Sequence, residues 1–259
     1  MKKVIAVFGS PHSGKSTLSL AIAASLATKK KDVVVLSGDK VSPMLKVYAP
    51  LADTPQSLSV GSLLMDSDVT EKAVTERILI HPKCERLGFM GMATGDNITT
   101  YPPRFLDDRV AALFSILYRL TDYLVIDCSS NPMTDSITLK GLEAAHVMVR
   151  LTTPDMMGLE FWRGMLGVLR DERFAASRAV PAINLAKPIS PVREVQQMHR
   201  AILGDIRYVF PYSHEVEDRM MAGRLVKWFG RKDGIVFETM LERLVKVEIL
   251  KGHSKAKEN

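Results

Sequence analysis

Short runs of apolar, β-branched residues alternate with segments of helical periodicity along the chain. A run that is apolar throughout, such as "VVVL", is typical of a strand in a parallel sheet that is covered on both faces. The pattern therefore predicts an α/β fold, a doubly wound, mostly parallel sheet with helices on both faces. The predicted strands are 3–8, 32–37, 77–80, 86–91, 123–128, 146–151, 179–184 and 206–210. The predicted helices are 14–30, 57–66, 69–77, 107–122, 134–145, 155–170, 191–202, 213–223 and 235–250.

The alternation continues without an internal repeat or a linker, which predicts a single domain over residues 1–250 and a flexible basic tail over 251–259. Apolar residues make up 46% of the 259 residues and charged residues 25%, as in ordinary globular proteins. The net charge of +6 permits contact with nucleic acid or anionic lipid without arguing for either. The first apolar run, Val4 to Phe8, is too short for a signal peptide or a membrane span. We therefore expect a cytoplasmic protein.

The first strand runs directly into "GSPHSGKS", which fits the pattern G-x-x-x-x-G-K-[ST] at the start of a predicted helix. Backbone N–H groups of this loop can converge on a phosphate, and the helix presents its positive end to the same place. Gly14 lets the backbone approach phosphate oxygens where a Cβ would clash. Lys15 places a charge near the β- and γ-phosphates, and the Ser16 hydroxyl can bind Mg²⁺. The loop residues predicted to bind a nucleotide are Gly9, Ser10, Pro11, His12, Ser13, Gly14, Lys15, Ser16 and Thr17.

Two aspartates follow predicted strands and are candidates for the metal shell. Asp39 comes after "VVVLSG", and Asp127 ends "YLVID". A buried strand that ends in a carboxylate can direct it at Mg²⁺ and its waters, as in a Walker B arrangement. An alternative for Asp39 is a turn residue before "KVSP". We expect Lys15, Asp39 and Asp127 to be catalytic, and Ser16, Asp39 and Asp127 to hold the metal.

The chain at this point resembles the MinD/ParA group of P-loop ATPases, which includes the pilus-assembly proteins CpaE and TadZ. The segments that carry the resemblance are "GSPHSGKST", "VVVLSGD", "DYLVIDCSSNPMTDSITLKGLEAAHVMVRLTTPD", "PAINLAKP" and "VFPYSHEVEDRMMAGRLV". The resemblance implies ATP and Mg²⁺ as cofactors. It also implies that Asp39 lies in the first switch, that Asn184 reads the adenine edge, and that Pro211 lies in the loop that packs on the base. An amide has the donor and acceptor that adenine requires, although capping the turn before Pro188 is an alternative for Asn184.

The chain departs from this family at two places. Most members have a lysine at the second loop position, and it reaches the phosphates of the partner subunit, but this chain has Ser10. The segment "DCSSNP" after Asp127 also differs from the usual switch sequence. Cationic groups at such positions contribute on the order of 10³-fold or more to phosphoryl transfer in related enzymes. We therefore expect nucleotide binding, with slow hydrolysis.

The resemblance implies a weak ATPase that acts as a nucleotide-dependent localisation or assembly factor for a bacterial pilus, secretion or conjugation machine. A nucleotide-dependent homodimer, protein partners of that machine and a peripheral position at the inner face of the membrane are also implied. The alternatives are a regulatory module that binds nucleotide without hydrolysis and a P-loop small-molecule kinase or ligase. The basic and aromatic segment 224–234 leaves membrane contact open, and the net charge leaves DNA contact open. The apolar spacing of the last helix is explained by docking on the sheet.

Overall fold

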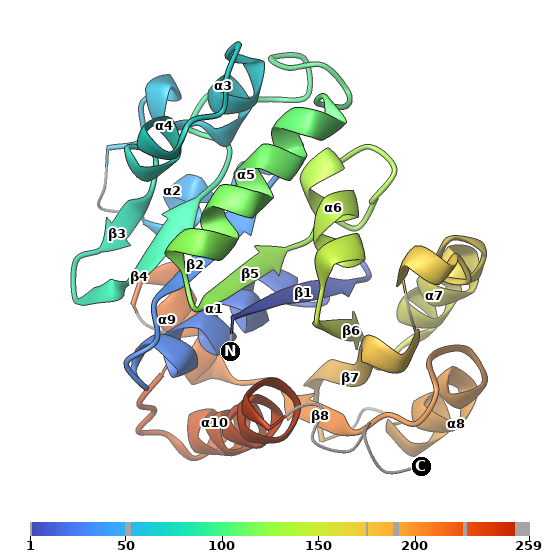
Figure 1. Ribbon diagram of the computed structural model, residues 1–259. Coiled ribbons are helices and arrows are strands. Elements are labelled where there is room, and N and C mark those ends of the chain that lie inside the picture. The colour runs from blue at the N-terminus through green and yellow to red at the C-terminus, as the bar shows by residue number, and fades with distance from the viewer. Residues whose placement is uncertain (1, 50–52, 175, 189–191, 225–226, 252–259) are drawn as a thin grey trace.

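The computed structural model describes residues 2–49, 53–174, 176–188, 192–224 and 227–251 (Figure 1). Within these residues the strands form one eight-stranded sheet in the order β3-β4-β2-β5-β1-β6-β7-β8. Neighbouring strands are parallel except β3, which pairs antiparallel with β4 at the edge. The predicted fold class is confirmed. The strands are β1 (Lys3–Gly9), β2 (Val33–Ser37), β3 (Leu79–His81), β4 (Cys84–Met90), β5 (Tyr123–Asp127), β6 (Val147–Thr152), β7 (Ala179–Ala186) and β8 (Tyr208–Pro211).

Within the described residues, the α-helices follow the predicted order with one added α-helix, and two 3-10 helices (Glu172–Phe174 and Ala176–Arg178) lie where no element is predicted. A short helix, α2, lies in a stretch for which the hydrophobic pattern predicts no element. The segment predicted as the last helix ends its α-helical part early and continues as a π-helix over Val245–Leu250. The helices are α1 (Lys15–Ala27), α2 (Leu45–Tyr48), α3 (Val60–Met65), α4 (Glu71–Thr75), α5 (Asp107–Leu120), α6 (Ser136–Ala144), α7 (Met156–Leu169), α8 (Val192–Leu203), α9 (His214–Met221) and α10 (Lys232–Leu244).

Two hydrophobic layers enclose the sheet, one on each face. Alternate residues of β1 belong to different layers, because successive side chains of a strand point to opposite faces. Val7 packs in the layer that includes α1 and α10, while Phe8 packs in the layer that includes α5, α6 and α7. Figure 1 shows α5 and α6 in front of the sheet and α1 behind it. Both layers exclude water from the strands, which explains why strands such as β2 are apolar throughout.

The last helix docks on the sheet, as the spacing of its apolar residues predicts. Phe237, Leu241 and Leu244 of α10 are buried, and the rings of Phe237 and Phe210 in β8 lie 5.3 Å apart. Val236, which the pattern places on the same stripe, is instead 47% exposed. None of the described helices is long and apolar enough to cross a membrane. The single-domain boundary stays a prediction, and residues 252–259 of the predicted tail lie outside the described residues.

Candidate functional site

The loop between β1 and α1 is held in a conformation that depends on two glycines. A Cβ on Gly9 would lie 2.1 Å from the carbonyl oxygen of Leu151 in the neighbouring strand β6. Gly14 has a φ of 80°, in the left-handed region, and a Cβ there would lie 2.4 Å from Asn184 Nδ2. That amide donates a hydrogen bond of 2.8 Å to the Ser13 carbonyl. The close packing therefore requires glycine at both positions of the motif.

Lys15 lies at the first turn of α1, and the hydrogen-bond partners of its amine among the described residues are neutral. Lys15 Nζ donates to the Ser10 carbonyl at 3.0 Å and to Ser130 Oγ at 2.7 Å. The Ser130 hydroxyl in turn donates to the Gly9 carbonyl at 3.0 Å. Burial lowers the pKa of Lys15, and the negative charge of Asp127 opposes that shift. Because an anion stabilises a buried ammonium better than a carbonyl or a hydroxyl does, the site favours a phosphate at this amine.

Asp127 ends β5 with its carboxylate almost entirely buried, at 3% exposure. Its Oδ2 accepts a hydrogen bond from the Tyr48 hydroxyl. Its Oδ1 is buried and has no hydrogen-bond partner among the described residues. Burial raises the pKa of Asp127, while the neighbouring Ser16 hydroxyl, Tyr48 and Lys15 oppose the shift. An unpartnered buried oxygen at the edge of a sheet is suited to a cation or to a water bound to one.

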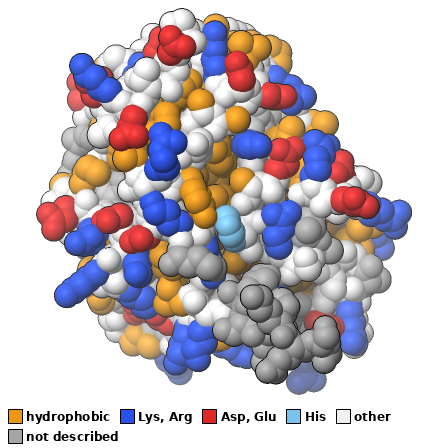
Figure 2. All heavy atoms as spheres, in the orientation of Figure 1, with side chains coloured by type: hydrophobic (Ala, Val, Ile, Leu, Met, Phe, Trp, Pro, Cys, Tyr) orange, Lys and Arg blue, Asp and Glu red, His pale blue; other side chains and the backbone are white. Residues whose placement is uncertain are grey.

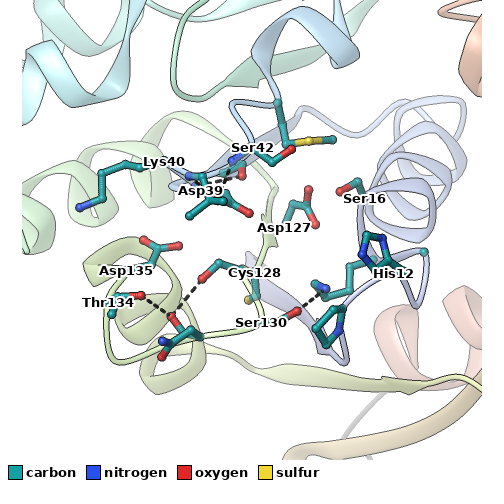
Figure 3. A pocket seen from close by; sticks show the side chains of 18 of the residues that line it. His12, Ser16, Asp39, Lys40, Ser42, Asp127, Cys128, Ser130, Thr134 and Asp135 are labelled. Atoms are coloured by element: carbon teal, nitrogen blue, oxygen red, sulfur yellow. Dashed lines mark hydrogen bonds between the residues drawn. The ribbon is translucent and has the colours of Figure 1, made fainter. Parts of the chain in front are cut away.

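Asp39 lies in the segment between β2 and α2, where it also forms a turn. Its Oδ1 accepts hydrogen bonds from the backbone N–H groups of Val41 at 2.9 Å and Ser42 at 3.1 Å. This is the turn that the sequence left open as an alternative. The side chain nevertheless lines the same cavity as Asp127. Figure 3 shows Asp39, Asp127 and Ser16 directed toward one space. The turn and a role at the metal are therefore compatible.

A cavity of about 760 Å³ brings most of the predicted site residues together. Its walls are the phosphate-loop motif and the start of α1, segment 39–44, and the loop 128–135 after β5. Ile98 and Pro103 from the long loop after β4 complete the wall. The predicted site residues that line it are Pro11, His12, Gly14, Lys15, Ser16, Thr17, Asp39 and Asp127.

The remaining predicted site residues lie outside the cavity wall. Ser10 is 2% exposed and packs inside the loop. Asn184 is 3% exposed and uses its amide nitrogen to hold the loop backbone. Pro211 ends β8 beside Ala186 of β7. Gly9 and Ser13 belong to the loop but do not line the cavity. The adenine-facing roles of Asn184 and Pro211 stay predictions.

Two residues that the sequence did not indicate contribute to this region. Tyr48 contacts Asp127 across 79 positions of sequence, from a segment with no distinctive pattern. Lys40 lines the cavity, but its amine donates to the carbonyls of Pro102 at 2.7 Å and Pro103 at 2.6 Å. Figure 3 accordingly shows the Lys40 amine directed away from Asp127. The contacts of both residues are tertiary, so the sequence pattern could not reveal them.

The oxygen donors of the cavity suit Mg²⁺ that is bound by the protein and a nucleotide together, rather than a metal ion that is bound by protein side chains alone. Ser16 and Asp127 would supply oxygen ligands, which Mg²⁺ prefers, and Asp127 Oδ1 accepts no hydrogen bond from the described residues. No cluster of three or more His, Cys, Asp or Glu side chains that could hold a metal occurs in the described part of the chain. Mg²⁺ commonly uses one or two carboxylates and completes its shell with phosphates and water. The site therefore suits a metal that arrives with a nucleotide.

Comparison with known proteins gives matches at the level of structure. No protein-family model matches the chain, and no curated protein matches it significantly. The ParA family ATPase from Chlorobium tepidum is 18% identical, with a TM-score of 0.76 over 95% of this chain and all 100% of that one. The septum site-determining protein MinD from Pyrococcus horikoshii, complexed with Mg-ADP, is 17% identical, with a TM-score of 0.71 over 97% of this chain and 99% of that one. A variant of McdA from Cyanothece in its ATP complex is 14% identical, with a TM-score of 0.71 and 95% of each chain covered.

These likenesses establish the fold. The eight-stranded, mostly parallel sheet with helices on both faces matches the P-loop NTPase fold of the MinD/ParA type. The Pyrococcus protein is described as complexed with Mg-ADP and the Cyanothece variant as complexed with ATP. The fold class thus agrees with the resemblance that the sequence motifs carry.

Proposed function

We propose that this chain binds ATP with Mg²⁺ in the cavity and acts in the cytoplasm as a MinD/ParA-like localisation or assembly factor. The single observation that carries the proposal is the meeting of three groups at one cavity: the N-terminal turn of α1, the Lys15 amine, and the carboxylates of Asp39 and Asp127. Cations and N–H groups on one side and carboxylates on the other are what a triphosphate with its metal requires. Two structural neighbours described with Mg-ADP and with ATP support this choice of ligand.

The residues of the loop have distinct parts in binding. Lys15 would exchange its neutral partners, the Ser10 carbonyl and Ser130 Oγ, for phosphate oxygens. Ser16 and Asp127 would hold Mg²⁺, which supplies charge stabilisation to the phosphates when bound. Asp39 would orient the attacking water from the opposite wall of the cavity. Gly14 keeps the loop backbone open to the phosphates by its left-handed conformation.

The proposal includes slow hydrolysis and a nucleotide-dependent homodimer. Ser10 is neutral and buried, so it cannot bring a positive charge to the phosphates of a second subunit. Charge that develops on the transferring phosphoryl group is then stabilised mainly by Lys15 and the metal. We assign the chain to the CpaE/TadZ-like group on this atypical loop, with a pilus, secretion or conjugation machine as its partner. The structural neighbours include a complex of MinD with MinC from Aquifex aeolicus, which supports protein partners for this fold.

Membrane and DNA contacts are left out of the proposal. In segment 224–234, Phe229 is buried and the Lys227 amine pairs with Glu238 at 3.4 Å and also with Glu242, so of the segment's two bulky aromatic side chains only Trp228, at 59% exposure, is exposed. On the face shown in Figure 2, Lys and Arg side chains are interspersed with Asp and Glu. Mixed charge of this kind weakens the field that would attract a phosphate backbone.

Titration calorimetry of the full chain with Mg-ATP tests the proposal. We expect saturable binding, and we expect Lys15→Ala to weaken it by about 10- to 100-fold, because a charge-assisted hydrogen bond is lost. Lys83→Ala, in the turn between β3 and β4, is the matched control and should bind as the wild type does. A folded wild-type chain that shows no saturable binding of any nucleoside triphosphate would refute the proposal.

A non-hydrolysing regulatory module is the second candidate, and the buried, neutral Ser10 favours it. Phosphate release separates it from a weak ATPase. Equal release by the wild type and by Lys15→Ala, with binding of ATP intact in the wild type, identifies the module without turnover. Slow release that disappears in Lys15→Ala identifies the ATPase.

A further inference from the structure

The hydrogen bond between Tyr48 and Asp127 links two segments that are distant in sequence. The Tyr48 hydroxyl donates to Asp127 Oδ2, and both side chains are buried. Tyr48 is the last residue of α2, which ends the segment 39–48, and that segment begins with Asp39. Asp127 ends β5, which pairs with β2 immediately before the same segment. One side-chain contact therefore ties the far end of segment 39–48 to the carboxylate of the proposed metal site.

The Tyr48 ring is also held by packing in the hydrophobic core. It is 3% exposed and belongs to the hydrophobic layer that covers one face of the sheet. Its centroid lies 5.7 Å from that of Phe89 in β4. Leu45, one turn earlier in α2, is fully buried in the same layer. Because packing fixes the ring, the direction of its hydroxyl is fixed as well, and the hydroxyl can serve as a rigid reference for Asp127.

The chemistry of a phenol suits this partner position. A hydroxyl donates one hydrogen bond and brings no charge, so Asp127 keeps its full negative charge for a cation. A lysine or arginine in the same place would neutralise the carboxylate and repel the metal. The bond also occupies only Oδ2, and Oδ1 stays without a partner among the described residues. The pairing thus satisfies one oxygen and leaves the other available.

We infer that Tyr48 is a positioning residue of the Mg-nucleotide site: it holds Asp127 Oδ2 so that Oδ1 is presented to the metal or to its water. The inference rests on the proposed function, which it deepens. Tyr48 is absent from the cavity wall, so it acts through Asp127 and has no direct contact with the nucleotide. Partners of this kind orient the oxygen atoms that a metal binds, and their loss is felt in metal affinity.

The test measures ATP affinity of the full chain by calorimetry, once with Mg²⁺ and once with EDTA. Tyr48→Phe keeps the ring and removes the hydroxyl. We expect its ATP affinity to fall about 10-fold with Mg²⁺ and to equal that of the wild type in EDTA, since only the metal-dependent part is lost. Tyr123→Phe, a buried tyrosine at the opposite end of the same strand, is the matched control and should bind as the wild type does in both conditions.

A double variant separates positioning from packing. In an Asp127→Asn background, Tyr48→Phe should cause no further loss of Mg-ATP affinity, because the carboxylate it positions is already gone. An equal loss with Mg²⁺ and with EDTA, an unchanged affinity in Mg²⁺, or an additive loss in the double variant overturns the inference while ATP binding by the wild type stands. Absence of ATP binding by the folded wild type overturns the proposed function together with this inference.

Discussion

Asp127 and Glu215 are both buried carboxylates, but they have very different hydrogen-bonding environments. Glu215, near the start of α9, accepts from the backbone N–H groups of Gly230 at 2.9 Å and Arg231 at 2.7 Å. The Arg219 guanidinium adds a third donor at 3.2 Å. Asp127, at the end of β5, accepts a hydrogen bond from Tyr48 at Oδ2, and its Oδ1 accepts none from the described residues.

The pKa values of the two groups move in opposite directions for this reason. Burial would raise the pKa of Glu215, but the donors from Gly230, Arg231 and Arg219 bring it below its ordinary value. At Asp127 burial dominates, and the pKa stays raised. Hydrogen-bond donors of the protein satisfy the carboxylate of Glu215, which holds α9 to the loop before α10. The carboxylate of Asp127 keeps one oxygen without a partner among the described residues, which is typical of a site that a ligand completes.

Glu215→Ala should produce the largest change in stability. It removes the acceptor of two backbone N–H groups and one of the acceptors of the Arg219 guanidinium, and removal of one partner from such a buried pair costs about 3 kcal/mol. Urea unfolding of the variant and the wild type measures the difference. Glu217→Ala, on an exposed face of the same helix, should change the free energy of unfolding by less than about 1 kcal/mol. Equal effects at the two positions would show that the hydrogen bonds of Glu215 are not what stabilises this region.

Asp127→Asn should lower the affinity for the nucleotide and leave the stability of the fold intact. Removal of a buried, incompletely paired charge should leave the free energy of unfolding unchanged or raise it by up to about 1 kcal/mol. The affinity for Mg-ATP should fall by about 10- to 100-fold, because the charge next to the metal is gone. Unfolding in urea and calorimetry with Mg-ATP check the two halves. A loss of stability as large as that of Glu215→Ala would contradict the comparison.

Acid should destabilise the C-terminal region by protonating Glu242, and the change in the free energy of unfolding should be smaller than that caused by Glu215→Ala. Burial would raise the pKa of Glu242, but hydrogen bonds from Lys227, Lys29 and Ser25 lower it to about 2. A carboxyl whose pKa is depressed in the folded state contributes stability above its unfolded pKa of 4.5, and that contribution is lost as the pH falls toward about 2. The side chain is 33% exposed, so solvent screening reduces the contribution to about 1 to 2 kcal/mol.

The pH dependence of unfolding checks this contribution. Between about pH 5 and pH 3, the free energy of unfolding of Glu242→Gln should fall less steeply than that of the wild type. Glu76→Gln, an exposed residue just after α4, provides the control and should leave the slope unchanged. Parallel curves for the wild type and Glu242→Gln would place the acid sensitivity elsewhere in the chain.

Much of the candidate site could be predicted from the sequence because its main parts are local or follow strands. The loop motif fixes the positions of Gly14, Lys15 and Ser16 within one turn of a helix. Asp39 and Asp127 converge because β2 and β5 are neighbours, with Ser37 in register with Asp127. The carboxyl ends of parallel strands lie at one edge, so the general rule for such sheets was sufficient.

The contacts of single polar side chains could not be predicted in the same way. The resemblance implies that Asn184 reads the adenine edge, which stays a prediction, and only the structure shows that its amide also donates to the Ser13 carbonyl. Tyr48 lies in a four-residue helix that the hydrophobic pattern does not reveal. Its partner is decided by how β4, β5 and α2 pack together. Periodicity carries no information about such a pairing.

The sequence by itself determined the order of the predicted strands and helices along the chain and the position of the glycine-containing loop motif after β1. Hydrophobic spacing and a short motif suffice for both, because each depends on interactions between residues close together in the chain. Tertiary structure alone decided that Asp127 Oδ1 has no hydrogen-bond partner among the described residues, that Tyr48 donates to Oδ2, and that Glu215 accepts from three donors. Burial and hydrogen bonding depend on residues brought together from distant parts of the chain, so these properties exist only once the sheet and its two helical layers have formed.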